Sequence, residues 1–173
     1  MSSKRPVRLC LKGVADSNFC LLPCPNIDQW FEEDTPIFVH PKDPFKRVDL
    51  VQSQRPIEVS LDGIELAKSA SCIHLYETLL PRRYYIPITS IDPKILRKSD
   101  TRTMCPYKGE AEYWHVTITS KDGTKHEHED LIWTYIRPTL ECGVIAGLAC
   151  FYNEKVDIKV DGREEERPKT FFG

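Results

Sequence analysis

The sequence predicts a mainly β fold of compact, coiled antiparallel sheets with one or two short helices. The dipeptide Asp-Gly, the strongest short-range hairpin signal, occurs at residues 62–63, 122–123 and 161–162, each time beside alternating apolar residues. Thirteen prolines interrupt the 173 residues often, which limits helix length. With 40% hydrophobic and 29% charged residues, the composition is that of a globular protein.

The hairpins and the remaining elements follow in chain order. Residues 57–69 and 112–129 each read as strand, turn and strand, and residues 155–162 alternate in the manner of a strand. Residues 90–98 predict a short helix. Residues 138–152 begin as a helix of one or two turns, which two glycines weaken, and continue as a strand.

The chain divides into three parts. Residues 1–40 form an N-terminal extension, in which 7–20 echo 57–72, so it is either a reduced half-repeat or simply another hairpin. Residues 41–162 form the main β domain. Residues 163–173 are a charged tail, expected to be mobile unless Phe171 and Phe172 dock.

The charge and the hydropathy of the sequence narrow the classes of possible binding partners. The net charge of −2 provides no basic field for nucleic acid or for an anionic membrane. No apolar run approaches the roughly 18 residues of a membrane span, and the N-terminus lacks the apolar region of a signal peptide. We therefore expect a cytoplasmic protein that binds a small molecule. The sequence is compatible with a homodimer but does not determine the oligomeric state.

The seven cysteines and a histidine pair are the candidate metal ligands. An odd cysteine count without a signal peptide favours reduced thiols, and no C-x-x-C pair is present to form a zinc knuckle. Cys20 and Cys24, or His126 and His128, remain as alternative ligand pairs, each lacking an evident third ligand. We expect neither a metal nor a cofactor.

The stretch CPYKGEAEYW, residues 105–114, concentrates reactive side chains around Gly109. If residues 110–118 form a strand, Tyr113 and His115 share one face, while Trp114 and both glutamates point to the other. His115 is a candidate general base, and Cys105 is either a nucleophile or a buried inert thiol. With one residue from the next stretch, the predicted catalytic set is Lys108, Tyr113, Glu77, His115 and Cys105.

Two further stretches supply the expected walls of a pocket. YETLLPRRYYIP, residues 76–87, offers an arginine to orient an anion, or else only a surface salt bridge between Glu77 and Arg82 or Arg83. LIWTYIRP, residues 131–138, adds two aromatic residues on one strand face. The predicted substrate-binding set is Arg82, Tyr84, Tyr85, Tyr107, Trp114, Trp133 and Tyr135.

Together these stretches resemble the domain-of-unknown-function family 427 over roughly residues 40–162, with C-P-Y-K-G-x-A-x-Y-W as the most specific block. The resemblance implies a β-tent-like fold. Relatives of that fold often hold zinc through two C-x-x-C pairs, which this sequence lacks. The positions that match the family's motif are Cys105 to Gly109, Ala111, Tyr113 and Trp114, and Glu77, Arg82, Tyr84 and Tyr85 match its preceding block.

These residues lead us to expect a cofactor-independent acid/base enzyme, such as an isomerase, cyclase or hydrolase. The alternatives are a non-catalytic module that binds a small molecule or peptide, and a nucleotidyltransferase. Only a catalogue label of the family favours the last, because the sequence has neither D-x-D nor a Gly-rich phosphate loop. Convergence of Lys108, Glu77 and His115 in one pocket would favour the enzyme.

Overall fold

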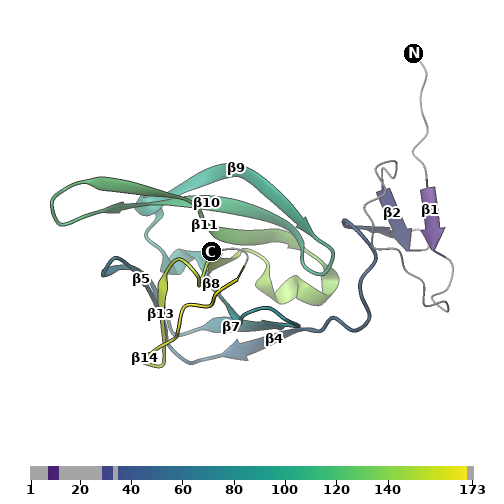
Figure 1. Ribbon diagram of the computed structural model, residues 1–173, viewed down its shortest axis with the longest axis horizontal. Helices are drawn as coiled ribbons and strands as arrows, with labels where there is room; N and C mark the ends of the chain where they lie inside the picture. The colour runs from purple at the N-terminus through teal and green to yellow at the C-terminus, as the bar shows by residue number, and fades with distance from the viewer. Residues whose placement is uncertain (1–7, 12–28, 33–34, 171–173) are drawn as a thin grey trace, which may run out of the picture.

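The computed structural model describes residues 8–11, 29–32 and 35–170 of the chain. Its architecture is mainly β, which confirms the predicted fold class (Figure 1). Within the described residues, helical structure is confined to three short 3-10 segments: η1 (Ile88–Ser90), η2 (Pro93–Ile95) and η3 (Leu140–Ile145). None of the helices in this part of the chain is long and apolar enough to cross a bilayer.

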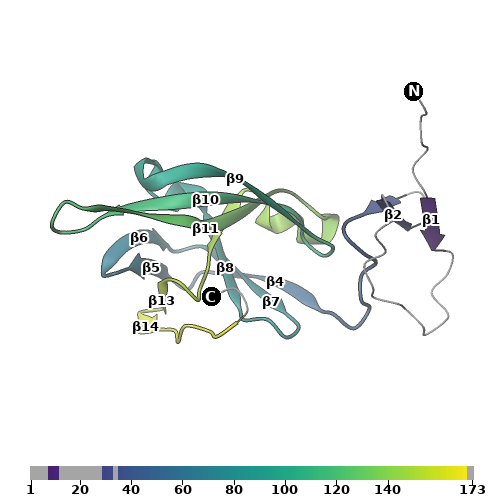
Figure 2. The ribbon, with the colours of Figure 1, turned by 45° about the horizontal axis from the view of Figure 1, so that its top comes forward.

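The largest sheet is antiparallel and seven-stranded. Its strands, in spatial order, are β4 (Val48–Ser53), β7 (Cys72–Glu77), β8 (Arg83–Pro87), β12 (Leu148–Phe151), β11 (Lys125–Pro138), β10 (Gly109–Thr119) and β9 (Leu96–Cys105). Figure 2 shows that β9, β10 and β11 bend over the limb formed by β4, β7 and β8. The bend gives the sheet an inner and an outer face.

A four-stranded sheet packs on the outer face. It consists of β14 (Arg163–Glu164), β13 (Asp157–Val160), β5 (Ile57–Leu61) and β6 (Ile64–Ser69). The Asp-Gly pairs at 62–63 and 161–162 join β5 to β6 and β13 to β14. All four of these residues have positive φ, between 52° and 76°, as a type I′ hairpin turn requires. The third Asp-Gly lies between β10 and β11, so all three predicted hairpins form.

Near the N-terminus, β1 (Arg8–Leu11), β2 (Gln29–Glu32) and β3 (Thr35–Ile37) form a separate three-stranded sheet, in which β1 and β2 are parallel. Most of the 7–20 stretch that echoes residues 57–72 lies outside the described residues. The same is true of Cys20, Cys24, Phe171 and Phe172.

Two hydrophobic cores occupy the two faces of the seven-stranded sheet. The first core lies between the sheets and is largely aliphatic, with Tyr84 among its members. The second core fills the inner face of the bend and is rich in aromatic residues, including Tyr85 and Tyr113. Adjacent strand residues point to opposite faces, so Tyr84 and Tyr85, or Tyr113 and Trp114, serve different cores.

The C-terminal segment up to residue 170 lies against the main domain rather than extending as a mobile tail. β14 pairs with β13, and two ion pairs of 2.7 Å follow, Glu165 with Arg82 and Arg167 with Asp157. This segment therefore contributes to the outer face of the domain.

Candidate functional site

The bend of the seven-stranded sheet brings its two edges together at one end. Glu77 ends β7, Lys46 precedes β4, and Tyr107 and Lys108 lie in the turn between β9 and β10. The Glu77 carboxylate accepts hydrogen bonds from the ammonium groups of Lys108 and of Lys46, the latter at 3.0 Å. The backbone N–H of Asp43 donates to the Tyr107 hydroxyl at 2.8 Å. Two of the predicted residues, Glu77 and Lys108, therefore meet across the sheet.

The turn that carries Lys108 is held tightly by its backbone. Gly109 has a φ of +102°, which favours glycine, and a Cβ at this position would lie 2.8 Å from the Arg137 carbonyl oxygen. Thr139 binds the turn twice: its N–H donates to the Lys108 carbonyl at 3.0 Å and its hydroxyl to the Tyr107 carbonyl at 2.6 Å. The position of the Lys108 side chain is therefore set by a rigid support.

The charges of this cluster do not cancel. Glu77 is only 3% exposed in its side chain, Lys108 is 12% exposed and Lys46 is 31% exposed. Burial alone would lower the pKa of Lys46, but the hydrogen bond to the Glu77 carboxylate and the negative charge of that carboxylate, with smaller contributions from Tyr107 and Cys105, together raise this pKa. Two ammonium groups share one carboxylate, so the cluster carries one net positive charge in a poorly hydrated place. Such a cluster attracts an anion.

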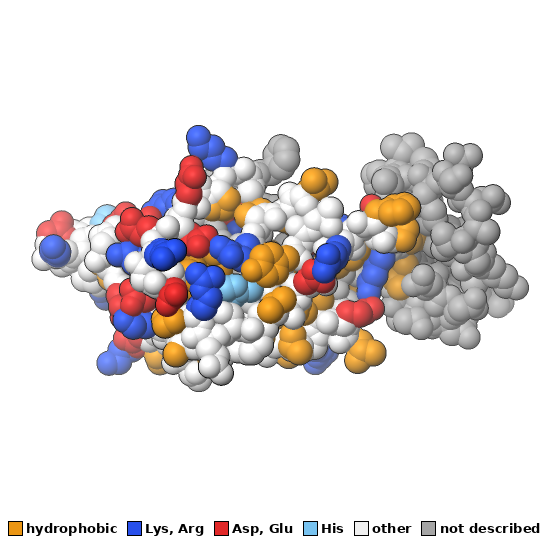
Figure 3. Space-filling view, turned by 90° about the horizontal axis from the view of Figure 1, so that it is seen from below, with side chains coloured by type: hydrophobic (Ala, Val, Ile, Leu, Met, Phe, Trp, Pro, Cys, Tyr) orange, Lys and Arg blue, Asp and Glu red, His pale blue; other side chains and the backbone are white. Residues whose placement is uncertain are grey.

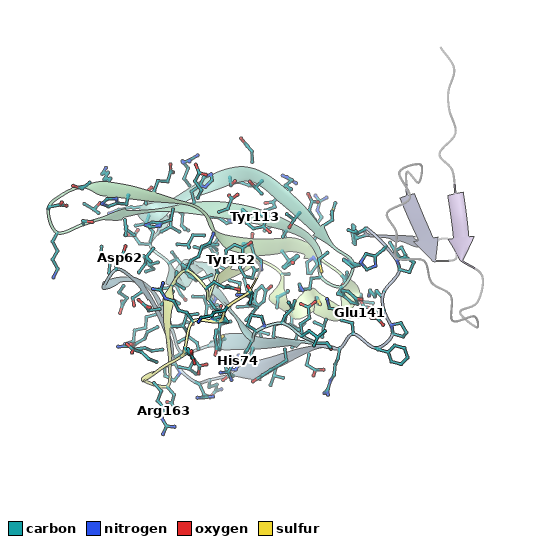
Figure 4. All side chains as sticks on the ribbon, viewed as in Figure 1. Asp62, His74, Tyr113, Glu141, Tyr152 and Arg163 are labelled. Atoms are coloured by element: carbon teal, nitrogen blue, oxygen red, sulfur yellow. The ribbon has the colours of Figure 1, made fainter. Side chains whose placement is uncertain are left out.

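Aromatic side chains continue from the ionic cluster along the inner face. The Trp133 indole N–H donates to the Tyr85 hydroxyl at 2.9 Å, and the Tyr113 hydroxyl lies 2.9 Å from that of Thr103. Tyr113 also lies within hydrogen-bonding reach of Tyr152 (Figure 4). Burial raises the pKa of Tyr135 and of Tyr152, because the charged phenolate would lose its hydration on this face.

A buried ion pair forms the far side of this inner face. Both guanidinium Nη atoms of Arg83 donate to Glu154, each at 2.7 Å, and the guanidinium lies 5.4 Å from the Trp133 ring centroid. Neither Arg83 nor Glu154 is among the predicted site residues. Alternation along β8 was the available signal, because Arg83 shares a strand face with Tyr85, whereas Arg82 does not.

Cys105 and His115 have different surroundings from each other. Cys105 is half-buried at the end of β9, where it packs against the aromatic core and lies near Lys46. His115 lies at a register shift in the pairing of β10 with β11, and its Nδ1 accepts the backbone N–H of Asp130 at 3.0 Å. His115 lies seven residues beyond Lys108 along the extended strand β10, which rises by about 3.3 Å per residue, so His115 does not join Lys108 and Glu77.

The structure also separates the predicted pocket walls. Tyr85, Trp133 and Tyr135 lie on the inner face, whereas Trp114 packs against the first core. Arg82 and Tyr84 lie on the outer face, where Arg82 pairs with Glu165. Glu77 is bonded to neither arginine. The predicted residues therefore belong to two sites on opposite faces of one sheet.

His126 and His128 lie on β11 near its hairpin end. Within the part of the chain that the structure describes, no three His, Cys, Asp or Glu side chains are grouped as a metal ion requires. The alternative pair, Cys20 and Cys24, lies outside that part.

His74 is a buried residue that the sequence analysis did not single out. It lies on β7, and its ring packs edge-on against Tyr84 with 5.0 Å between the centroids. Its Nε2 atom is buried and makes no hydrogen bond within the described residues. Burial, followed by the nearby charges of Arg82 and Arg55, lowers the pKa of His74.

This lowered pKa makes stability depend on pH. Below the ordinary histidine pKa of about 6.5, the unfolded chain binds a proton that folded His74 does not, so stability falls as the pH falls. This one group can change the free energy of unfolding by at most about 1.4 kcal/mol per pH unit. We expect urea unfolding between about pH 5 and pH 7.5 to show a smaller slope in His74→Phe. His126→Phe is the control, and an unchanged slope in His74→Phe would contradict the assignment.

The fold and the site together define a mainly β protein with an ionic and aromatic site on the inner face of a bent sheet. Residues 49–162 match the family described as a domain of unknown function (DUF427), and the chain belongs to this family. The match includes Glu77 and Lys108 but ends before Glu165, and Lys46 precedes it. No curated protein matches the chain.

Proposed function

We propose that this protein acts on a small organic anion at the inner face of the bent sheet, as a cofactor-independent enzyme that uses acid/base chemistry. The observation that carries the proposal is the convergence of Lys46 and Lys108 on the single buried carboxylate of Glu77. The extra positive charge would attract the anion, and the neighbouring aromatic rings would hold its apolar part.

The reaction that suits these groups is proton abstraction next to a carbonyl. Glu77 would take the proton, and the electron pair of the broken C–H bond would move to the carbonyl oxygen. The Lys108 ammonium would stabilise the resulting enolate. Return of a proton to the opposite face of the same carbon would complete an isomerisation by inverting that centre, with no oxidant or reductant consumed. The hydroxyl groups of Tyr113 and Tyr135 would supply hydrogen bonds to the same oxygen.

A binding module is the second candidate. Two ammonium groups already hydrogen-bond to the Glu77 carboxylate, so a ligand must draw one lysine away before this carboxylate can contact the substrate. If the lysines stay in place, the same cluster binds an anion without turning it over.

A nucleotidyltransferase rests on the family label alone. Lys and Arg lie among Asp and Glu on the face in Figure 3, which is not the broad basic surface that nucleic acids need.

We further propose a cytoplasmic location. The described cysteines, Cys72, Cys105, Cys142 and Cys150, are all free thiols, which is the usual state in a reducing compartment. A homodimer remains a prediction, to be measured by the mass of the protein in solution.

Thermal unfolding with a panel of small carboxylates tests the inner-face site. A ligand at 100 times its Kd should stabilise the protein by about 2.7 kcal/mol, and Lys108→Met should lose most of that gain. Lys42→Met is the matched control, because Lys42 forms an exposed ion pair with Glu141 at 2.9 Å. Binding that is unchanged in Lys108→Met would contradict the site, and stabilisation only by a nucleotide with Mg²⁺ would support the family label instead.

Isotope exchange then separates the enzyme from the binding module. A carboxylate that binds is incubated with the protein in D₂O, and loss of its C–H signal is followed by NMR. Hydrogen–deuterium exchange that occurs with the wild-type protein but not with Glu77→Gln indicates proton abstraction by Glu77. Binding without exchange indicates the module.

A further inference from the structure

A pocket of about 220 Å³ lies on the outer face of the seven-stranded sheet, away from the inner-face site. Tyr76 and Tyr84 line it from β7 and β8, Arg82 from the turn between them, and Asn153 and Glu165 from later in the chain. The sheet separates it from Glu77, because Tyr76 and Glu77 are adjacent on β7 and point to opposite faces. Nothing in the proposed function uses this pocket.

Arg82 supplies the positive charge of the pocket. Its guanidinium lies 5.2 Å from the Tyr84 ring centroid and 5.9 Å from that of Tyr76. One hydrogen bond of 2.7 Å joins its Nη2 to Oε2 of Glu165. A guanidinium can hold a carboxylate by two parallel hydrogen bonds, whereas Glu165 accepts one and the Tyr76 side chain also interacts with Arg82, so the present contact leaves room for a better-fitting carboxylate. The site already accepts this kind of group, because Glu165 occupies it.

Asn153 supplies a hydrogen-bond acceptor beside Arg82. Its Nδ2 donates to the Arg82 carbonyl oxygen at 2.8 Å, which fixes the orientation of the amide. The Oδ1 atom of Asn153 therefore points away from the Arg82 carbonyl. It is buried and has no hydrogen-bond partner among the described residues, and Asn153 as a whole is only 8% exposed. The Tyr84 hydroxyl is also buried and lacks a hydrogen bond of good geometry. Buried groups of this kind are costly unless a partner satisfies them.

We propose that this pocket binds a small carboxylate that carries a hydrogen-bond donor on the adjacent carbon, namely an α-hydroxy or α-amino acid. The ligand carboxylate accepts two hydrogen bonds from the Arg82 guanidinium. The neighbouring hydroxyl or ammonium group donates to Oδ1 of Asn153, and the Tyr84 hydroxyl binds the second side of the carboxylate. In the free protein, the carboxylate of Glu165 occupies the place that the ligand carboxylate would take beside Arg82.

Glu165 is suited to give way to such a ligand. It lies beyond residues 49–162, the part that matches the family, on a terminal segment with anchors of its own. The pairing of β14 with β13 precedes Glu165, and the ion pair of Arg167 with Asp157 at 2.7 Å follows it. The side chain can therefore leave Arg82 while the segment stays docked.

Isothermal titration of the full chain with lactate and with propionate tests the proposal, because propionate lacks only the hydroxyl group. Lactate should bind more tightly than propionate by about tenfold, the effect of one satisfied buried acceptor. Glu165→Gln should tighten lactate binding by about threefold to fivefold, because it removes the competing carboxylate. Glu164→Gln is the matched control, since its carboxylate faces Lys159 at 3.5 Å and not Arg82.

Arg82→Lys keeps the charge but loses the two-pronged geometry, and it should weaken lactate binding by at least tenfold. The preference for lactate over propionate and the effect of Glu165→Gln should both persist in Lys108→Met, which separates this pocket from the inner-face site. Equal affinity for lactate and propionate would overturn the role of Asn153. Absence of lactate binding to Glu165→Gln at tens of millimolar would overturn the pocket as a carboxylate site, as would unchanged affinity in Arg82→Lys.

Discussion

Replacing Arg83 with Met should lower the free energy of unfolding by about 3–5 kcal/mol, because Glu154 would keep a buried charge without its cation. The side chains of Arg83 and Glu154 are only 9% and 2% exposed. Thr170 also donates a hydrogen bond to Glu154, but a hydroxyl group cannot neutralise the carboxylate. The loss is to be measured by urea unfolding at neutral pH.

An exposed pair of similar geometry provides the control. Arg97 and Glu127 are also 2.7 Å apart, but their side chains are 58% and 40% exposed. Arg97→Met should therefore cost much less stability than Arg83→Met. Similar losses in Arg83→Met and Arg97→Met would mean that burial of the inner pair has no energetic consequence.

Acid provides a second check on the same pair. Burial would raise the pKa of Glu154, but its hydrogen bonds to Arg83 and Thr170 outweigh burial and lower this pKa. The pair therefore stabilises the fold above the ordinary glutamate pKa, and this contribution is lost as the pH falls through the lowered value. In Arg83→Met the carboxylate protonates more readily, so the difference between variant and wild type should shrink near about pH 4. The double variant Arg83→Met, Glu154→Leu should regain most of the stability.

Local sequence signals were enough to locate the three Asp-Gly turns and the strands that lead into them. Asp-Gly pairs and alternating apolar residues depend on a few neighbouring residues, so they located all three hairpins. The same alternation separated Tyr113 from Trp114, and the structure places these two residues in different cores. Applied to β8, it would also have separated Tyr84 from Tyr85 and favoured Arg83 over Arg82 for the inner face.

Partners across the sheet could not be read in the same way. Glu77 meets Lys46 and Lys108 only because the sheet bends until its two edges approach, and curvature arises from many strands together. Lys108 and Glu77 were chosen for their chemistry, whereas Lys46 lies in a connector with no local signal of its own. The separation of His115 from Lys108, in contrast, follows from their spacing along one extended strand, which the sequence alone could have indicated.

Replacing Gly109 with Ala should cost about 2–4 kcal/mol of stability, the second large effect that we expect. A φ of +102° is unfavourable for alanine, and the added Cβ would lie 2.8 Å from the Arg137 carbonyl oxygen and 3.2 Å from the Pro138 Cα. Both neighbours are backbone atoms of β11, so relief requires the turn itself to move. The free energy of unfolding is to be measured by urea denaturation.

Gly123→Ala separates the cost of placing alanine at a positive φ from the cost of a steric clash of the added Cβ. Gly123 also has a positive φ, +86°, but no atom lies within 4 Å of an added Cβ. That variant should lose only the conformational part, about 1 kcal/mol. Because Gly109 follows Lys108 directly, movement of the turn in Gly109→Ala should also pull the ammonium group away from Glu77. Carboxylates that bind the inner face should then lose affinity in Gly109→Ala and keep it in Gly123→Ala, and equal affinity in both variants would show that Lys108 does not need this rigid turn.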